Sequence, residues 1–350
     1  MSEKAYTMAN QQPLKLKGAP GSPYTRKMLA YLRYRHIPYQ FLIGDQATDL
    51  GFPTPKVELL PTFYLPNDDG DIEAVVDSTP LIRRFETAFE DRAALPHDPV
   101  LGFINYLIED YADEWLTKCM FHYRWYYDPD IEKAGNILPL WRAMQVPDEA
   151  HQKMAAYVSD RQISRLYVVG SNDTTAPVIE ASYHRFLDIM NKILTERPFL
   201  FGTRPASADF GIYAQLTQLA GFDPTPAAIC LRETPRVYAW VDIVDDLSGN
   251  PADPSGWRSA EEIKALLGDL LNEIGKVYVP ALLANAEALK AGEKTMETTI
   301  DGLPWHQPTF PYQGKCLQWI NESYLTLDDE SRTRVDEILT GTGCEQLMIA

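Results

Sequence analysis

Gly18-Ala-Pro-Gly-Ser22-Pro-Tyr-Thr25-Arg-Lys27 is the stretch of this chain that decides its fold. It follows a short apolar run and predicts the start of a helix, because serine is a favoured N-cap and proline a favoured first helical residue. A helix start is an anion site, since its unpaired N–H groups and the helix dipole both favour negative charge. Such a site also lowers the pKa of a nearby thiol. The stretch contains no cysteine, so the thiol has to come from a ligand.

The Ser-x-x-Thr-Arg motif after a Gly-Xaa-Pro turn resembles the N-terminal signature of the serine-type glutathione transferases. In that family the serine donates a hydrogen bond to the thiolate of glutathione. The resemblance implies a thioredoxin-like fold, glutathione as co-substrate and Ser22 as the catalytic residue, with Tyr24 and Thr25 as further donors. The residues by themselves are equally compatible with an ordinary N-cap at Ser22.

A proline interrupts the extended segment Val57–Leu65. Proline lacks the N–H that a sheet ladder needs, and X-Pro is the only peptide bond for which the cis form is cheap. The resemblance implies a cis bond between Leu60 and Pro61 that faces the start of the first helix. It also implies that the backbone of Leu60 pairs with the cysteinyl part of glutathione. Taken alone, the segment is more typical of a trans proline in a loop.

The pair Asp77-Ser78 follows a hairpin turn signal at Asn67–Asp71 and a β-branched run at Ile72–Val76. It predicts the start of another helix. Glutathione transferases usually carry Glu-Ser here, so the resemblance implies that Asp77 and Ser78 bind the γ-glutamyl end of glutathione. Asp77 is one methylene shorter than the family's residue, and an ordinary helix cap is the alternative.

The segment Arg197–Tyr213 resembles the folding signature of the family's helical domain. In the family a Ser or Thr and an Asp three residues later form a reciprocal cap, but here Asp209 is preceded at that distance by Ala206. Either Ser207 takes over the cap, or half of the box is lost at a cost of about 1 kcal/mol. A Pro-led helix at Glu233–Trp240 extends the resemblance, which runs from about residue 14 to about residue 247.

A long helical pattern spans Phe103–Trp125 and is rich in aromatic residues. In the family the corresponding helix flanks the pocket for the electrophilic co-substrate, which makes Tyr111, Trp115 and His122 candidates for its lining. Packing in the core is the simpler use of each of these side chains.

Acidic residues on the same helix predict a solvated face rather than a metal site. These residues are Asp110, Asp113 and Glu114, and no His or Cys lies at ligand spacing from them. The cysteines Cys119, Cys230, Cys316 and Cys344 have no Cys-x-x-Cys spacing, so we expect reduced thiols and no structural zinc.

Charge and hydropathy restrict the partners. The 350 residues carry a net charge of −17, and residues 1–100 contribute 11 Lys and Arg against 13 Asp and Glu. This surface repels phosphate backbones, so nucleic acid is not expected, whereas the nearly neutral first hundred residues suit the anion glutathione. Residues 1–12 lack a signal-peptide core and no run of 18 apolar residues occurs, which predicts a cytoplasmic protein without a membrane segment.

The tail contains no recognised catalytic motif. Apolar residues recur at helical spacing from Ser259 to about Leu289, and Thr295–Asp301 has the composition of a strand. An aromatic and proline-rich loop is expected at Gly302–Tyr312. His306 in that loop could cover the active site, although a loop packed on its own domain is the simpler interpretation.

These observations predict an α/β domain followed by an all-α domain. A thioredoxin-like glutathione-binding domain at residues 13–92, a helical glutathione-transferase domain at 100–248 and a helical extension at 249–350 are expected. The predicted function is transfer of glutathione to a small hydrophobic electrophile in detoxification, by a homodimer that needs no metal. A glutathione-dependent lyase, reductase or isomerase and a non-catalytic scaffold with the same fold are the alternatives.

Overall fold

The structure, a computed structural model, describes residues 12–253 and 255–348, so the prediction for residues 1–11 lies outside the described residues. It begins with a four-stranded sheet of order β2-β1-β3-β4. The strands are β1 (Leu14–Lys17), β2 (Tyr39–Leu42), β3 (Thr62–Pro66) and β4 (Ile72–Val75). β1 runs parallel to β2 and antiparallel to β3, and β3 runs antiparallel to β4. This mixed sheet is the thioredoxin-like half of the predicted fold.

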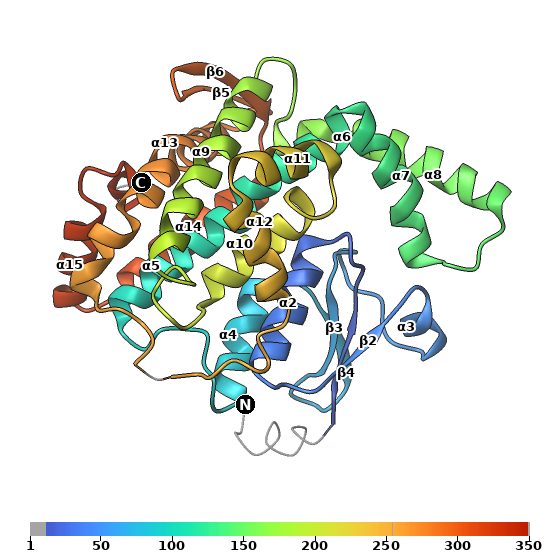
Figure 1. The fold of residues 1–350 in the computed structure, drawn as a ribbon, viewed down its shortest axis with the longest axis horizontal. Coiled ribbons are helices and arrows are strands. Elements are labelled where there is room, and N and C mark those ends of the chain that lie inside the picture. Colours follow the sequence, from blue (N-terminus) through green and yellow to red (C-terminus); the bar gives the residue numbers. More distant parts are fainter. Residues whose placement is uncertain (1–11, 254, 349–350) are drawn as a thin grey trace.

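Helices cover both faces of this sheet. They are α2 (Pro23–Tyr34), α3 (Gln46–Asp49) and α4 (Ser78–Ala88). Figure 1 shows α2 and α4 between the sheet and most of the other helices, with α3 on the other side of the sheet. Successive side chains of β3 point to opposite faces of the sheet. Phe63 packs in the main core, and Tyr64 packs in a small cluster with Ala47 of α3.

The helical domain begins with a helix that is capped by Asp98. The Asp98 carboxylate accepts hydrogen bonds from the N–H groups of Val100 and Leu101. Its helices are α5 (Pro99–Tyr111), α6 (Thr117–Tyr126), α7 (Asp128–Arg142), α8 (Asp148–Ile163), α9 (Ala176–Glu196), α10 (Ser207–Leu219), α11 (Pro224–Glu233) and α12 (Pro235–Asp245), with a short η2 turn (Leu166–Val169). A π-helical turn, η1 (Ala112–Leu116), joins α5 to α6. The predicted long helix over residues 103–125 is therefore confirmed.

The cap of α10 resolves the two alternatives left by the sequence. Asp209 accepts a hydrogen bond from the N–H of Ala206 at 2.8 Å, but alanine has no side-chain acceptor to return it. Ser207 is the first residue of α10 and donates its hydroxyl proton to Glu109 of α5 at 2.6 Å. Half of the reciprocal cap is thus lost, and Ser207 connects α10 to α5 instead.

The chain continues past residue 248 into further helices and a hairpin. These are α13 (Ala260–Ala291), β5 (Thr295–Ile300), β6 (Leu303–Pro308), α14 (Pro311–Leu325), α15 (Asp329–Leu339) and the η3 turn (Cys344–Met348). The expected loop at 302–312 is wrong for residues 303–308, which pair with β5. Asp301 and Gly302 both have positive φ, as a two-residue hairpin turn requires. Two prolines in β6 concealed this strand in the sequence.

One hydrophobic core runs through the described residues, from Leu16 of β1 to Leu347 of η3. Helix α13 contributes fully buried side chains to it, among them Leu271 and Tyr278. The segment after residue 248 is therefore packed on the helical domain. No helix among the described residues is both long enough and apolar enough to cross a membrane.

Candidate functional site

Ser22 lies at the N-terminus of α2, opposite a cis proline. Its backbone is extended, with φ −93° and ψ 117°, and its Oγ accepts from the N–H of Thr25 at 3.2 Å. The same hydroxyl donates to the carbonyl oxygen of Leu60 at 3.2 Å. The Leu60–Pro61 bond is cis, so this expectation is confirmed. Ser22 is half-buried, and it combines an N-cap with a polar group directed at the residue before the cis proline.

The two other hydroxyls of the motif are bonded inside the chain. Tyr24 donates to the carbonyl oxygen of Asp113 at 2.7 Å and lies 2.9 Å from Thr117 Oγ1. Burial, followed by the charges of Glu114 and Asp113, raises the pKa of Tyr24, which keeps it a neutral donor. Thr25 is fully buried and its hydroxyl accepts from the N–H of Ala19 at 3.3 Å. The structure therefore brings neither hydroxyl to an open surface beside Ser22.

Asp77 and Ser78 lie at the N-terminus of α4. Asp77 has φ 82°, a backbone conformation that non-glycine residues seldom adopt, and its side chain makes no cap hydrogen bond. Its Oδ2 accepts from the hydroxyl of Tyr312 at 2.8 Å. The Ser78 hydroxyl is buried and accepts from Lys27 Nζ at 3.2 Å.

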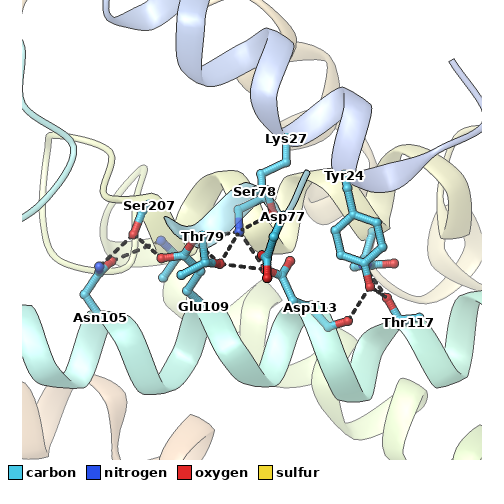
Figure 2. Close-up of polar contacts among 12 residues, drawn as sticks. Tyr24, Lys27, Asp77, Ser78, Thr79, Asn105, Glu109, Asp113, Thr117 and Ser207 are labelled. Atoms are coloured by element: carbon cyan, nitrogen blue, oxygen red, sulfur yellow. Dashed lines mark hydrogen bonds and ion pairs between the residues drawn. The ribbon is translucent and has the colours of Figure 1, made fainter. Parts of the chain in front are cut away.

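A buried ionic cluster lies between α2, α4 and α5 (Figure 2). Lys27 has no exposed side-chain surface, and its Nζ lies 2.6 Å from both Glu109 Oε1 and Asp113 Oδ2. The hydroxyl of Thr79 in α4 lies 3.1 Å from Glu109 Oε1 and 3.2 Å from Asp113 Oδ2, and its one proton can be donated to either. Burial alone would lower the pKa of Lys27, but Asp113 and Glu109 together raise it, so the ammonium group stays charged.

The acidic residues of this helix are not a solvated face, which corrects the expectation from the sequence. Asp110 and Asp113 are 8% and 7% exposed, because α2, α4 and α13 cover this side of α5 and η1. Burial raises the pKa of Asp113 to about 6 and that of Asp110 to about 7. Burial and the charge of Asp110 raise the pKa of Glu114 to about 8. At neutral pH Glu114 is therefore mainly protonated, whereas Lys27 pairs with Glu109 and Asp113.

The candidates for a co-substrate pocket lie in the core. Tyr111, Trp115 and His122 have no exposed surface. The indole N–H of Trp115 donates to Ser182 at 3.0 Å, and the ring nitrogens of His122 lie 2.8 Å from Ser171 Oγ and 3.2 Å from Glu180 Oε1. These contacts tie α6 and η1 to α9, and the structure does not bring the three side chains together with Ser22.

The hairpin does not place His306 over the site. His306 is exposed, and its carbonyl oxygen lies 3.3 Å from Asn172 Nδ2. Its neighbour Trp305 is buried against Trp115, with ring centroids 5.4 Å apart.

No local pattern in the sequence predicts that Lys27 and Tyr312 contact residues of this region. Lys27 belongs to the quoted motif, but nothing local shows that α5 neutralises it. Tyr312 lies 235 positions from Asp77 in the chain. A sequence alone offers no signal for a contact between groups so far apart.

The chemistry of these groups suits an anion beside Ser22 and a cation beside Asp77. The start of α2 offers backbone N–H groups and a hydroxyl, which suit a thiolate. The carboxylate of Asp77 suits an ammonium group, whereas Asp113 already pairs with Lys27. A ligand that carries both charges at its two ends would match both places.

Comparison with known proteins identifies the first domain. Residues 16–93 match the family described as the glutathione S-transferase N-terminal domain. Among curated proteins, no match to the chain is found.

Solved structures are similar to the chain at low identity. A glutathione transferase family member from Pseudomonas fluorescens Pf-5, with two glutathione bound, is 13% identical over 71% of this chain and 96% of its own, at a TM-score of 0.41. A glutathione S-transferase from Rhodospirillum rubrum F11 is 17% identical over 71% of this chain and 98% of its own, at a TM-score of 0.41. The Tau class glutathione S-transferase from mango is 17% identical over 72% of this chain and 95% of its own, at a TM-score of 0.38.

Proposed function

We propose that this chain, whose residues 16–93 match the glutathione S-transferase N-terminal domain family, is a glutathione transferase that binds glutathione and transfers its thiolate to a hydrophobic electrophile. The observation that carries the proposal is the position of the Ser22 hydroxyl. It lies at the start of α2, 3.2 Å from the carbonyl oxygen of the residue before a cis proline. A thiol held there meets a hydrogen-bond donor and the positive end of a helix dipole together.

Ser22 acts by exchanging one acceptor for another. In the free protein its proton is donated to Leu60, and in the complex it is donated to the thiolate of glutathione. A free thiol has a pKa of about 8.5, and lowering it toward neutrality raises the thiolate fraction at pH 7 roughly tenfold. The bound thiolate then attacks the electrophile, forms the carbon–sulfur bond and displaces the leaving group or adds to the acceptor carbon. Holding both reactants in place contributes further rate.

The rest of glutathione is assigned to Leu60, Asp77 and Ser78. The backbone of Leu60 pairs with the cysteinyl part, and Asp77 accepts from the γ-glutamyl ammonium group. Ser78 accepts from Lys27, but a hydroxyl still has its own proton to donate, here to the γ-glutamyl carboxylate.

We assign the same three regions as the sequence indicates: glutathione binding at 13–92, the helical domain at 100–248 and the extension at 249–350. A cytoplasmic homodimer in detoxification is the setting we propose for this activity. The low net charge of the first hundred residues supports binding of an anionic peptide there.

A non-catalytic binding protein is the second candidate. It is supported by the internal partners of the motif's hydroxyls, since Tyr24 and Thr25 are bonded within the chain and Ser78 to Lys27. A lyase, reductase or isomerase that uses glutathione would share the site, and analysis of the products separates it from a transferase, because only a transferase leaves a stable thioether.

The test is replacement of Ser22 by alanine. Losing one hydrogen bond to a charged group costs about 1.5–3 kcal/mol, which is a fall of roughly 10- to 150-fold in the rate of conjugation. Affinity for glutathione should change far less, since it is distributed over several contacts. Ultraviolet titration of bound glutathione should show a higher thiol pKa in Ser22→Ala than in the parent.

Asp98→Ala is the matched control, because it also removes an N-cap but from α5. It should lower stability by about 1 kcal/mol and leave the thiol pKa unchanged. Equal thiol pKa values in Ser22→Ala and the parent would refute the role of Ser22. Binding of glutathione without any thiolate in the parent would favour the non-catalytic candidate.

A further inference from the structure

Ser22 ends a tight turn whose central residues contact the helical domain. The N–H of Ser22 donates to the carbonyl oxygen of Ala19 at 3.0 Å, which closes a turn over residues 19–22. This hydrogen bond does not involve the carbonyl oxygens of the two central residues, Pro20 and Gly21. Both of these oxygens accept hydrogen bonds from side chains of α6 and α10.

Arg124 of α6 and Gln218 of α10 make these two contacts. Arg124 Nη1 donates to the carbonyl oxygen of Gly21 at 3.0 Å, and Gln218 Nε2 donates to that of Pro20 at 3.1 Å. The two side chains are joined, because Arg124 Nη2 donates to Gln218 Oε1 at 2.7 Å. They are 4% and 2% exposed. Residues that lie 103 and 198 positions away in the chain therefore bind two successive carbonyl groups of the turn.

Asp223 fixes the orientation of the Arg124 guanidinium group. Arg124 Nε lies 2.9 Å from Asp223 Oδ1, and Nη2 lies 2.9 Å from Oδ2, which is the two-pronged geometry of a strong arginine–carboxylate pair. Asp223 has no exposed surface, and its backbone N–H donates to the carbonyl oxygen of Gln218 at 2.8 Å. Because the ion pair as a whole is neutral, Arg124 acts on the turn through the fixed position of its hydrogen bond.

A third helix, α7, packs on the same turn. A Cβ at Gly21 would lie 2.3 Å from Leu138 Cδ2 and 2.9 Å from Trp141 Cζ3. The ring of Trp141 lies 5.0 Å from that of Phe222, and the Arg124 guanidinium carbon lies 5.1 Å from the same Phe222 ring. The absence of a side chain at position 21 lets α7 lie directly against the turn, so packing and hydrogen bonds hold it together.

The planarity of the peptide bond transmits these contacts to Ser22. The carbonyl group of Gly21 and the N–H and Cα of Ser22 lie in one plane, so a hydrogen bond that fixes this carbonyl also fixes the plane from which Ser22 projects. The Ser22 hydroxyl itself has two neutral partners at 3.2 Å, the N–H of Thr25 and the carbonyl oxygen of Leu60. The second contact is given up when the hydroxyl donates to a thiolate. The direction of the hydroxyl then depends on where the backbone of Ser22 lies.

We propose that Arg124 and Gln218 are positioning residues for Ser22, which hold the turn at residues 19–22 so that the Ser22 hydroxyl points at the thiolate of bound glutathione. Asp223 supports them by orienting Arg124. This inference rests on the proposed function, in which Ser22 donates to the thiolate. It adds that side chains of the helical domain help to activate the thiol without contacting glutathione.

The experiment compares Gln218→Met with the parent, both as full chains. Methionine is similar in size to glutamine but cannot donate to Pro20 or accept from Arg124, whereas the pair of Arg124 with Asp223 remains. With glutathione and chlorodinitrobenzene as substrates, kcat should fall about 3- to 10-fold, as expected for the loss of a neutral hydrogen bond. The affinity for glutathione, measured by calorimetry, should change less than twofold. Ultraviolet titration should show a higher pKa for the bound thiol.

The variant Ser22→Ala separates positioning from other effects of Gln218. If Gln218 acts through Ser22, Gln218→Met should cause no further change of kcat or thiol pKa in a protein that already carries Ser22→Ala. Independent effects would instead add in the double variant.

Gln307→Met is the matched control. The amide of Gln307 is also buried and also accepts from a cation of α6, because Lys118 Nζ donates to it at 3.2 Å. Gln307→Met should lower the unfolding temperature as Gln218→Met does, but leave kcat and the thiol pKa unchanged. If Gln218→Met does not fold, Arg124→Lys provides the same test, since it keeps the positive charge beside Asp223 and loses the planar fork.

Two results would overturn the inference. Equal changes of kcat and thiol pKa in Gln218→Met and Gln307→Met would mean that Gln218 only stabilises the fold. Full additivity with Ser22→Ala would mean that Gln218 does not act through Ser22. In both cases the parent still conjugates glutathione and the proposed function stands, whereas a parent that binds no glutathione refutes the proposed function and this inference with it.

Discussion

The thioredoxin-like domain and the extension after residue 248 are built on different kinds of contact. In the first domain local interactions mark where helices begin, such as the hydrogen bond between Ser22 and Thr25 at the start of α2. The extension acts over long distances in the chain, through Tyr312 on Asp77 and Tyr278 on Asp110. The two regions meet at the acidic side of α5 and η1. The comparison teaches that a network of polar contacts can begin in a recognisable motif and be extended by a region without one.

The largest effect is expected at the cluster that joins α2 to α5. Lys27→Met should lower the free energy of unfolding by about 3–5 kcal/mol, because it leaves Glu109 and Asp113 buried without their cation. Urea denaturation followed by circular dichroism measures this change.

The neighbouring Arg26 provides the control. Its ion pair with Asp245 is 3.1 Å long, but the two side chains are 32% and 42% exposed. Arg26→Met should therefore change stability by no more than about 1 kcal/mol. Equal losses of stability in the two variants would show that the buried ion pairs of Lys27 stabilise the protein no more than the exposed ion pair of Arg26.

The local part of this fold could be predicted from the sequence. An N-cap such as Ser22 acts on an N–H group three residues away, so residues within one short stretch carry the whole signal. The Asp301-Gly302 turn is also local, yet the two prolines of β6 led to the prediction of a loop in place of a hairpin.

The acidic side of α5 could not be predicted, for a physical reason. Asp110, Asp113 and Glu114 have the spacing of a solvated helix face, and a helix sequence has the same pattern whether water or another domain covers it. Only the arrangement of α2, α4, α13 and α14 around α5 and η1 decides that these carboxylates are buried. The contact of Tyr312 with Asp77 depends on the same arrangement, and no motif in the extension indicates it.

The second prediction tests whether the extension packs as firmly as the first domain. A Cβ at Gly275 in α13 would lie 1.9 Å from the backbone oxygen of Thr342 and 2.9 Å from Gly343 Cα. Backbone atoms cannot rotate away, so Gly275→Ala should destabilise the protein by about 1–3 kcal/mol. Thermal and urea unfolding both measure the loss.

Gly268 lies in the same helix, and a Cβ there meets no heavy atom within 4 Å. Gly268→Ala should stabilise the protein by about 0.5–1 kcal/mol, since alanine is the better helix former. Opposite signs for the two variants would place the end of the extension firmly against α13. If Gly275→Ala stabilised the protein as well, the close contact between α13 and the segment at 342–343 would be wrong.

The smallest effect concerns the pH dependence of stability at the contact between α5 and α13. Burial raises the pKa of Asp110 in the folded protein to about 7, against about 3.9 in an unfolded chain. Between these values the folded state holds a proton that the unfolded state has lost, so the stability contributed by this group falls as pH rises and is constant above the folded pKa. The charged groups that face Asp110 are Glu109, Asp113, Glu114 and Lys27, and the Tyr278 hydroxyl donates to it.

Asp110→Asn removes this titration and retains an oxygen that can accept from Tyr278. Relative to the parent, the variant should gain about 1 kcal/mol between pH 6 and pH 7, measured as the difference between their free energies of unfolding. Asp328→Asn is the control, because the backbone N–H of Ser331 holds the pKa of Asp328 below its usual range. The difference in free energy of unfolding between Asp328→Asn and the parent should stay constant over this interval. If the Asp110→Asn curve runs parallel to the parent's, Asp110 is ionised throughout. The Tyr278 hydroxyl of the extension would then donate to a charged carboxylate on α5, and not to a carboxyl group that holds a proton.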